Sequence, residues 1–316
     1  AAGAEPTLYF VFSGHGRRTP AGDGTIQLLD GDFTRDELFE QIIDRAKARW
    51  VHLIVDACDS YFFVNARGTQ LPVAPPTTAA VAEHLAEHSL ERHPNVGAVV
   101  STTSEQESHE WQAIGAGVFS HQIRSALSGA ADVNGDGRIE YSEVAAFVAA
   151  ANAQVTDPRQ RVNVSVHPMA LDRAHPMIDL TRASTSAHLL LPRRLQGHYW
   201  LEDGRGVRVL ELNKEAGQPL LIAFPGAQTY YLRTEGREVR FTATAGALLD
   251  GARLEFSTAA LAARGATDAM FRERLFAEPY GARFYQGFVS SSSDVPVAAS
   301  VGQQLRGTVR ASPAGE

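Results

Sequence analysis

Two short polar segments each follow a run of apolar residues within the first 60 positions. Leu8 to Phe12 leads into Ser13-Gly14-His15-Gly16, and Val51 to Val55 leads into Asp56-Ala57-Cys58-Asp59-Ser60. A thiolate beside an imidazole is an activated nucleophile, and the same imidazole can later protonate a leaving amine. His15 and Cys58 therefore have the side chains that acyl transfer requires. The alternative is a buried structural cysteine and a histidine in a turn.

The two apolar runs are typical of buried β-strands, and the residues between them favour a helix. Residues 34–49 have helical composition, and Thr34 can cap the helix N-terminus. A third apolar run, 96–100, follows another helical stretch at 79–90, and this alternation indicates an α/β sheet with parallel crossovers. The carboxyl ends of parallel strands lie at one edge, so we expect His15 and Cys58 to meet there.

The glycines beside His15 allow a tight turn and close backbone approach. The backbone N–H groups of Gly16 and Cys58 are then the expected donors to a tetrahedral oxyanion.

Taken in order, these motifs resemble the paired motifs of the caspase and metacaspase clan of cysteine proteases. That clan separates its histidine and cysteine by about 50 residues. Residues 101–110 and Gly117-Val118-Phe119-Ser120 resemble the segments that follow in bacterial caspase homologues. The resemblance covers roughly residues 6–180. It implies a cysteine endopeptidase of the α/β class, a three-layer sandwich with a mainly parallel central sheet, and no organic cofactor.

The resemblance also implies a substrate preference. Metacaspase-like members cleave after Arg or Lys with an acidic pocket, to which Asp56 and Ser13 correspond here. A carboxylate suits a guanidinium through charge-assisted hydrogen bonds. The alternative for Asp56 is a structural cap at a strand end. Arg67, before Gly68 in a long loop, is a candidate site of self-processing, and an ordinary loop arginine is the alternative.

Residues 132–143 match the twelve-residue loop of an EF-hand calcium site. The side-chain oxygen ligands at loop positions 1, 3, 5, 9 and 12 are Asp132, Asn134, Asp136, Glu140 and Glu143. Gly137 gives the sharp turn, and the carbonyl of Arg138 is the backbone ligand. The helical segments 119–127 and 143–151 flank the loop. We expect bound Ca²⁺ that fixes these two helices, although a single copy is unusual; a loop without metal is the alternative.

The sequence divides into three parts. Residues 1–185 form the expected protease domain, whose first strand and helix would lie upstream in the related proteins. Residues 186–256 alternate short apolar runs (197–201, 207–212, 220–224, 230–233) with turn signals, which predicts a small all-β domain of β-sandwich type. Residues 257–316 contain a helical stretch at 259–276 and a flexible tail from Ser290.

The amino-acid composition disfavours some classes of binding partner. A net charge of −7 disfavours nucleic acid, and the single cysteine excludes an intramolecular disulfide. No apolar run is long enough to span a membrane. His84 and His88 lie among glutamates and favour a solvated helix face, while His167 and His175 fall in a turn-rich segment that predicts a connector. We expect a protein or peptide substrate; any targeting segment would be upstream. The competing function is a caspase-like interaction scaffold without catalysis.

Overall fold

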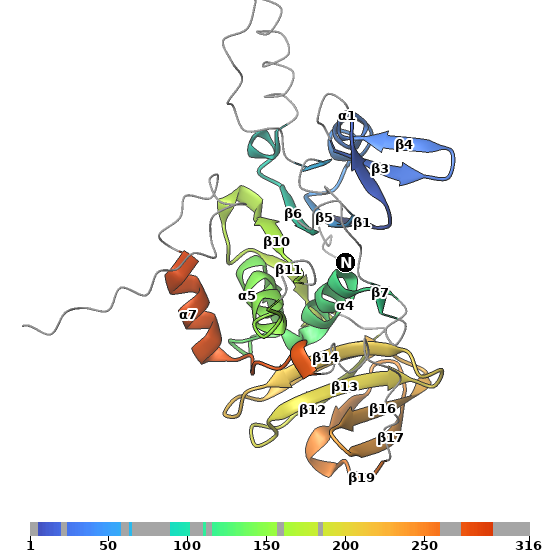
Figure 1. The fold of residues 1–316 in the computed structure, drawn as a ribbon, viewed down its shortest axis with the longest axis vertical. Helices are drawn as coiled ribbons and strands as arrows, with labels where there is room; N and C mark the ends of the chain where they lie inside the picture. Colours follow the sequence, from blue (N-terminus) through green and yellow to red (C-terminus); the bar gives the residue numbers. More distant parts are fainter. Residues whose placement is uncertain are drawn as a thin grey trace, which may run out of the picture.

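The computed structural model describes residues 6–19, 24–57, 63–64, 89–101, 110–111, 116–156, 161–182, 186–259 and 273–292. Within these ranges the fold is mixed α/β: a central sheet, a layer of helices and a second group of sheets follow one another along the long axis (Figure 1). In this part of the chain, no helix has the length and apolar character needed to cross a membrane.

The central sheet has the strand order β1-β5-β6-β10. Its strands are β1 (Thr7–Ser13), β5 (Trp50–Asp56), β6 (Val96–Ser101) and β10 (Val164–His167). β1, β5 and β6 are parallel, as the apolar runs predict, and β10 is antiparallel to β6. The connector assignment of His167 is wrong, because this residue ends β10 and pairs with Ala98.

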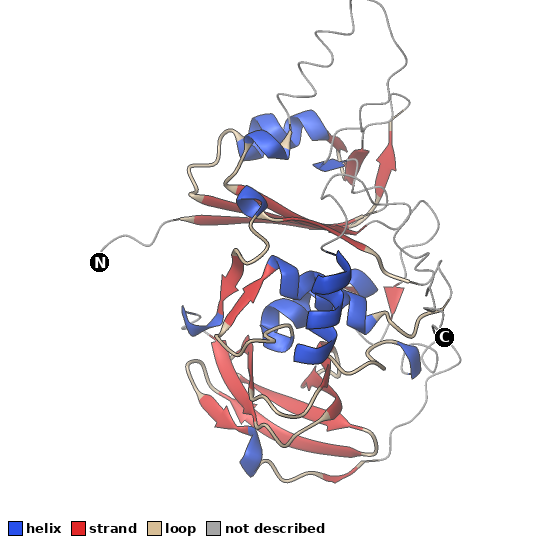
Figure 2. Cartoon of the chain, turned by 90° about the vertical axis from the view of Figure 1, so that its left-hand side faces the viewer, coloured by secondary structure: helices blue, strands red, loops and turns tan. Residues whose placement is uncertain are grey.

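The two faces of the central sheet carry different layers, which Figure 2 shows on either side of it. Leu53 and Val55 pack with Leu38 and Phe39 on one face, whereas Ile54 faces the larger helical core on the other. Side chains alternate between faces along a strand, so a continuous apolar run fits a strand that is covered on both sides.

The helical segment after Thr34 is shorter than the sequence predicts. It consists of α1 (Arg35–Glu37) and a π-helical turn, η1 (Leu38–Ile43). Thr34 caps it as expected, since its Oγ1 accepts the Glu37 N–H at 3.2 Å. The segment ends well before Arg49, because the Arg49 N–H donates to the Pro6 carbonyl and the chain there is already entering β5.

A small antiparallel sheet follows His15 directly. Its strands are β2 (Gly16–Arg18), β3 (Gly24–Leu28) and β4 (Gly31–Thr34). The Gln27 N–H donates to the His15 carbonyl at 2.9 Å, so this sheet holds the backbone of His15.

The helical layer surrounds the predicted calcium loop. Before the loop come α4 (Val118–Ser125) and the π-helical turn η3 (Ala126–Ala130); after it come β9 (Arg138–Glu140) and α5 (Tyr141–Ala151). β11 (Pro176–Asp179) pairs with β9, so the residue after His175 begins a strand rather than a connector. The short elements nearby are η2 (Leu90–Arg92), β7 (Glu110–Trp111), β8 (Ala116–Gly117), η4 (Met169–Leu171) and η5 (Leu180–Arg182).

The C-terminal strands form two sheets, β15-β12-β18 and β14-β13-β16-β17-β19. Their bounds are β12 (Ser186–Leu191), β13 (Gly197–Asp203), β14 (Arg208–Lys214), β15 (Leu220–Pro225), β16 (Gln228–Thr234), β17 (Arg237–Ala243), β18 (Leu248–Asp250) and β19 (Ser257–Thr258), with η6 (Gly251–Arg253) between the last two. The four predicted strands of this part are thus confirmed as β13 to β16. We call residues 186–258 the β module.

The β module and the helical layer share one apolar core. Phe119 of α4, Phe147 of α5 and Leu210 of β14 belong to the same buried cluster.

A helix that the sequence does not predict, α7 (Ala282–Ser292), contacts α5 through the hydroxyls of Tyr285 and Ser142 at 2.9 Å. The predicted tail from Ser290 therefore starts inside a helix, and most of the predicted helix 259–276 lies outside the described residues.

Candidate active site

The carboxyl ends of β1 and β5 lie side by side at one edge of the central sheet. Ser13 pairs with Asp56 as the last step of the parallel register. The next residue, Gly14, donates its N–H to the Asp56 carbonyl at 3.0 Å, so the ladder continues one step beyond the strand. His15 follows and its side chain is exposed.

Cys58 lies outside the described residues, as do Asp59, Ser60 and Arg67. After β5, the last described residue before this gap is Ala57, which is buried with 4% of its surface exposed. His15 stands two positions after Ser13, and Cys58 stands two positions after Asp56. In the sequence, the two candidate residues thus follow the ends of adjacent parallel strands by the same number of positions.

The Asp56 side chain is the centre of a small polar cluster. Its Oδ2 accepts the Ser120 N–H at 3.1 Å, a hydrogen bond from the Ser120 hydroxyl, and a long one from the Ser13 hydroxyl at 3.5 Å. The Ser120 and Ser13 hydroxyl oxygens are 3.3 Å apart. The structure therefore brings together the two predicted pocket residues, and adds Ser120 from α4. We call Ser13, Asp56 and Ser120 the pocket cluster.

Asp56 also caps a helix, although not in the way the sequence predicts. The first turn of α4 has Gly117 at its N-cap, which offers no side chain, and Asp56 accepts an N–H of that turn instead. An anionic acceptor is favourable there because of the helix dipole and the unpaired amides. The capping interpretation and the pocket interpretation are therefore compatible.

The pKa of Asp56 lies above that of an ordinary aspartate. Burial is the main cause, and the hydrogen bonds from Ser120 and Ser13 oppose it without cancelling it. The carboxylate is thus partly stripped of water, which strengthens its attraction for a cation.

The backbone N–H of Gly16, a predicted oxyanion donor, does not pair with β3. The bond from Gln27 N–H to the His15 carbonyl makes Gly16 and Ile26 a non-hydrogen-bonded pair of the antiparallel ladder. The Gly16 N–H therefore points away from β3 and is not used in this small sheet.

Ser120 is the site residue that sequence reasoning missed. It was placed only in a segment that resembles other proteins, and its contact with Asp56 spans 64 positions. The one local signal is that α4 starts at a glycine with no side chain to cap it, so its first amides need an acceptor from elsewhere.

The 132–143 loop, where the sequence predicts a calcium site, turns sharply at Gly137. Gly137 has φ +77°, in the left-handed region that favours glycine. The Gly137 N–H donates to Asp132 Oδ2 at 2.9 Å, and the Arg138 N–H donates to Asp136 Oδ1 at 2.8 Å. Asn134 likewise accepts the Asp136 N–H.

The acidic side chains of the loop accept backbone hydrogen bonds. The oxygens of Glu143, which is fully buried, take the N–H groups of Val133 and Glu140 at 3.0 and 2.9 Å. Burial raises the pKa of Glu143 to about 8, and also raises the pKa of Asp132 and of Glu140. No three His, Cys, Asp or Glu side chains in the described ranges are gathered closely enough to hold a metal ion. The donor types and the turn fit calcium, but the carboxylates bond to nearby backbone N–H groups instead of converging on one point.

Two other candidate sites carry less chemistry. A cavity of about 190 Å³ borders Asp132, Lys214 and Tyr280. It is smaller than the ~300 Å³ at which ligand pockets usually begin. His84 and His88 lie outside the described residues, so the structure does not bear on them.

Comparisons with protein-family models, with curated proteins and with solved structures found no match for this chain.

Proposed function

We propose that the chain is a cysteine endopeptidase with Cys58 as nucleophile and His15 as general base and acid. The observation that supports this most strongly is the register of β1 and β5. Ser13 pairs with Asp56, so the two candidate residues each follow a paired strand end by the same two positions. Open α/β sheets usually carry their sites at this edge, and the motifs resemble the caspase and metacaspase clan.

The reaction is an acyl transfer. His15 takes the proton of the Cys58 thiol, and the thiolate attacks the carbonyl carbon of the scissile peptide bond. The C–N bond then breaks as the imidazolium gives its proton to the leaving amine. His15 next takes a proton from water, whose oxygen forms a bond to the acyl carbon of the thioester. The C–S bond then breaks, the carboxyl product leaves, and the imidazolium returns its proton to the Cys58 thiolate. The Gly16 and Cys58 N–H groups would bind the oxyanion of each tetrahedral intermediate.

The pocket cluster supports a preference for Arg or Lys before the scissile bond. The three hydrogen bonds described above all end on Asp56 Oδ2. A guanidinium or ammonium group would therefore meet Oδ1, and the exposed Ser13 lines the approach. The negative charge of a partly buried carboxylate favours binding of a cationic substrate side chain and disfavours binding of an acidic one.

Calcium binding in the 132–143 loop belongs to the same proposal. Asp132, Asn134, Asp136, Glu140 and Glu143, with the Arg138 carbonyl, would hold the ion. Bound calcium would supply positive charge that offsets the buried carboxylates of Asp132 and Glu143. The loop lies between α4, which carries Ser120, and α5, so the ion would fix both helices.

The test of the proposal is turnover of fluorogenic peptides that end in Arg, Lys or Asp, in calcium and in chelator. We expect cleavage after Arg and Lys that disappears in Cys58→Ala, together with labelling of Cys58 by a thiol-directed inhibitor. A matched control, Ser290→Ala at an exposed position of α7, should cleave as the wild type does. Absence of both turnover and labelling would leave the alternative, a caspase-like scaffold without catalysis.

A further inference from the structure

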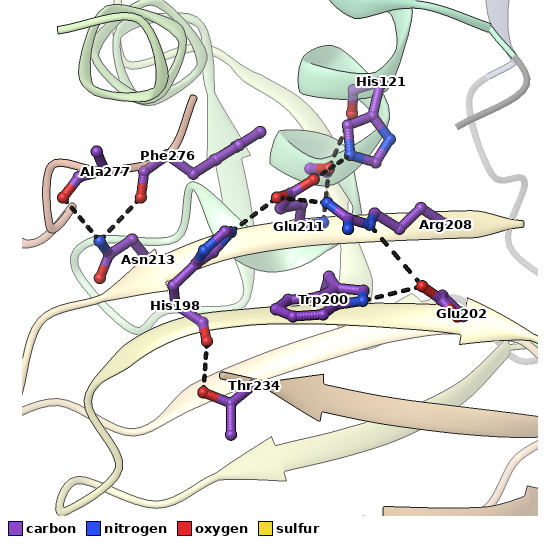
Figure 3. A network of polar contacts seen from close by, with 11 residues as sticks. His121, His198, Trp200, Glu202, Arg208, Glu211, Asn213, Thr234, Phe276 and Ala277 are labelled. Atoms are coloured by element: carbon purple, nitrogen blue, oxygen red, sulfur yellow. Dashed lines mark hydrogen bonds and ion pairs between the residues drawn. The ribbon is translucent and has the colours of Figure 1, made fainter. Parts of the chain in front are cut away.

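Ser120 and His121, which are consecutive on α4, connect that helix to two different parts of the molecule. Ser120 contacts Asp56 at the sheet edge. His121 is buried and its Nε2 lies 3.1 Å from Oε2 of Glu211, on strand β14 of the β module (Figure 3). The same turn of helix thus contacts both the pocket cluster and the β module.

Glu211 is the centre of this second contact. It is completely buried, and its Oε1 accepts hydrogen bonds from Arg208 Nη1 at 2.9 Å and from His198 Nε2 at 2.7 Å. Figure 3 shows the three partners converging on the carboxylate from α4, β13 and β14. A buried carboxylate is stable only when its oxygens are satisfied in this way.

The protonation states fit a fixed hydrogen-bond order. Burial alone would raise the pKa of Glu211, but Arg208 and the two histidines hold it well below the usual value, so the group is ionised. Burial lowers the pKa of His121, although Glu211 opposes this, so the ring is neutral. Its Nε2–H then donates to Glu211 and its Nδ1 accepts from Arg124 Nη2 at 3.0 Å.

Two further bonds fasten α4 to β14. Arg124 donates to the Arg208 carbonyl at 2.6 Å, and the Glu211 N–H donates to the Ser125 hydroxyl at 3.0 Å. With the His121 contact, these bonds run along one side of α4 from its first turn to its last residue. The helix end that carries Ser120 is therefore oriented by β14.

We propose that Glu211 is a positioning residue for the pocket cluster: it acts across the module boundary through His121 to hold Ser120 against Asp56. This inference rests on the proposed function only in treating the cluster as a substrate pocket. It gives the β module a role in the site, although none of its described residues contacts Asp56 through a hydrogen bond.

The experiment compares Glu211→Gln with wild type by hydrogen exchange of the Ser120 amide, which donates to Asp56. A glutamine keeps one acceptor oxygen, which can still serve Arg208 and His198, and turns its NH₂ group toward the Nε2–H of His121. The His121 contact therefore weakens while the shape of the side chain is kept. We expect the Ser120 amide to exchange about tenfold faster, with amides of β5 and β6 unchanged. Arg124→Met removes the hydrogen bond from α4 to the Arg208 carbonyl of β14 and is the milder change. It should also speed exchange of the Ser120 amide, and it replaces Glu211→Gln in the experiment if that variant fails to fold.

The matched control is Glu238→Gln, which removes a half-exposed carboxylate paired with Arg233 at 3.1 Å inside the β module. It should leave Ser120 exchange unchanged. In peptide assays, Glu211→Gln should raise KM for Arg substrates more than tenfold with little change in kcat. Ser120 exchange equal to wild type in the folded variants, or a uniform rise across β5, β6 and α4, would overturn the inference. Because exchange needs no turnover, an inactive wild type would refute the proposed function and still leave this test decisive.

Discussion

Gly117 lies so close to Asp56 that a Cβ atom placed on it would come within 2.7 Å of the carboxylate oxygen Oδ2. The absence of a side chain at this position lets α4 begin directly against the pocket cluster. The close approach makes Asp56 both a cap of the helix and, in our proposal, the group that selects the substrate.

Gly117→Ala should therefore damage the pocket more than the fold. The added methyl group must push the Asp56 carboxylate or the first turn of α4, and a misplacement near 1 Å can reduce activity by about 100-fold. We expect kcat/KM for Arg peptides to fall by about one to two orders of magnitude, measured in steady-state assays. Gly287→Ala, in α7 with open space around it, is the control and should retain full activity. Equal activity of both variants would contradict the close contact.

Substitutions of Asp56 can separate its capping role from its charge. Asparagine keeps an oxygen that accepts the Ser120 N–H, but it has no charge to attract a basic side chain. We expect Asp56→Asn to melt close to wild type and to lose the preference for Arg and Lys. Asp56→Ala should also lose about 1 kcal/mol of stability through the missing cap. The measurements are thermal unfolding and the ratio of Arg to Gln peptide turnover. A preference that survives in Asp56→Asn would rule out the pocket role.

The raised pKa of Asp56 predicts an acid limb in substrate binding. Only the ionised carboxylate attracts a cation, so KM for Arg peptides should rise as the pH falls through a value above that of an ordinary aspartate. The folded pKa of Asp56 exceeds the unfolded one, so the titration of this group does not itself destabilise the fold as the pH falls. The measurement is KM from pH 8 to pH 4 with Arg and with uncharged peptides. A limb of equal size with both peptides would argue against Asp56.

The parts of this fold that local pattern determines were predictable. The runs at Leu8–Phe12 and Val51–Val55 form the parallel strands β1 and β5. β5 is buried on both faces, as a continuous apolar run predicts, whereas Tyr9 and Val11 leave one face of β1 exposed. Thr34 caps its helix through a bond between residues three positions apart. Gly137 takes the left-handed turn that its loop position requires. The cap and the turn depend on interactions within a few residues, and the strands on the apolar runs themselves.

The contacts that complete the site were not predictable, because they join distant segments. Ser120 is an ordinary polar residue of a helix until Asp56 is placed beside it. Glu211 has the pattern of a solvent-facing strand residue, yet it is buried because α4 covers that face of β14. The helix before β5 was predicted too long for the same reason, since pairing of Arg49 with Pro6 overrides its helical composition.

A buried hydrogen bond connects β5 to the start of α5, and removing one hydroxyl group abolishes it. His52 Nδ1 lies 2.8 Å from the hydroxyl of Tyr141, the first residue of α5, and Tyr9 stacks on the same ring. Burial, and less strongly His175, lowers the pKa of His52 to about 4. The imidazole of His52 is therefore neutral, and the Tyr141 hydroxyl is the hydrogen-bond partner of its Nδ1. Tyr141→Phe should reduce the free energy of unfolding by about 1–3 kcal/mol in urea denaturation at pH 7.5.

Tyr285→Phe is the matched control, since its hydroxyl bonds Ser142 at the partly exposed start of α5. It should cost only a few tenths of a kcal/mol, because water replaces the lost partner. The lowered pKa of His52 also means that stability falls as the pH drops from about 6.5 toward 4, where the folded state resists protonation. A Tyr141→Phe protein as stable as wild type would show that His52 finds another partner.

Calcium binding is best tested with a variant that spares the fold. Asp136 is exposed, and its Oδ1 accepts only a local N–H, that of Arg138 two positions on, among the bonds described for it. Asparagine can keep that bond, so Asp136→Asn removes one ligand charge without disturbing buried groups. In calorimetric titration we expect heat from the wild type, at least tenfold weaker affinity in Asp136→Asn, and no binding in Glu143→Gln.

Asp172→Asn is the control, because Asp172 makes the same local bond to Ala174 outside the loop. Calcium should also raise the melting temperature of wild type and of this control equally, that of Asp136→Asn less, and that of Glu143→Gln not at all. Negligible heat from the wild type would mean that the backbone hydrogen bonds of Asp132 and Glu143 hold the loop without an ion.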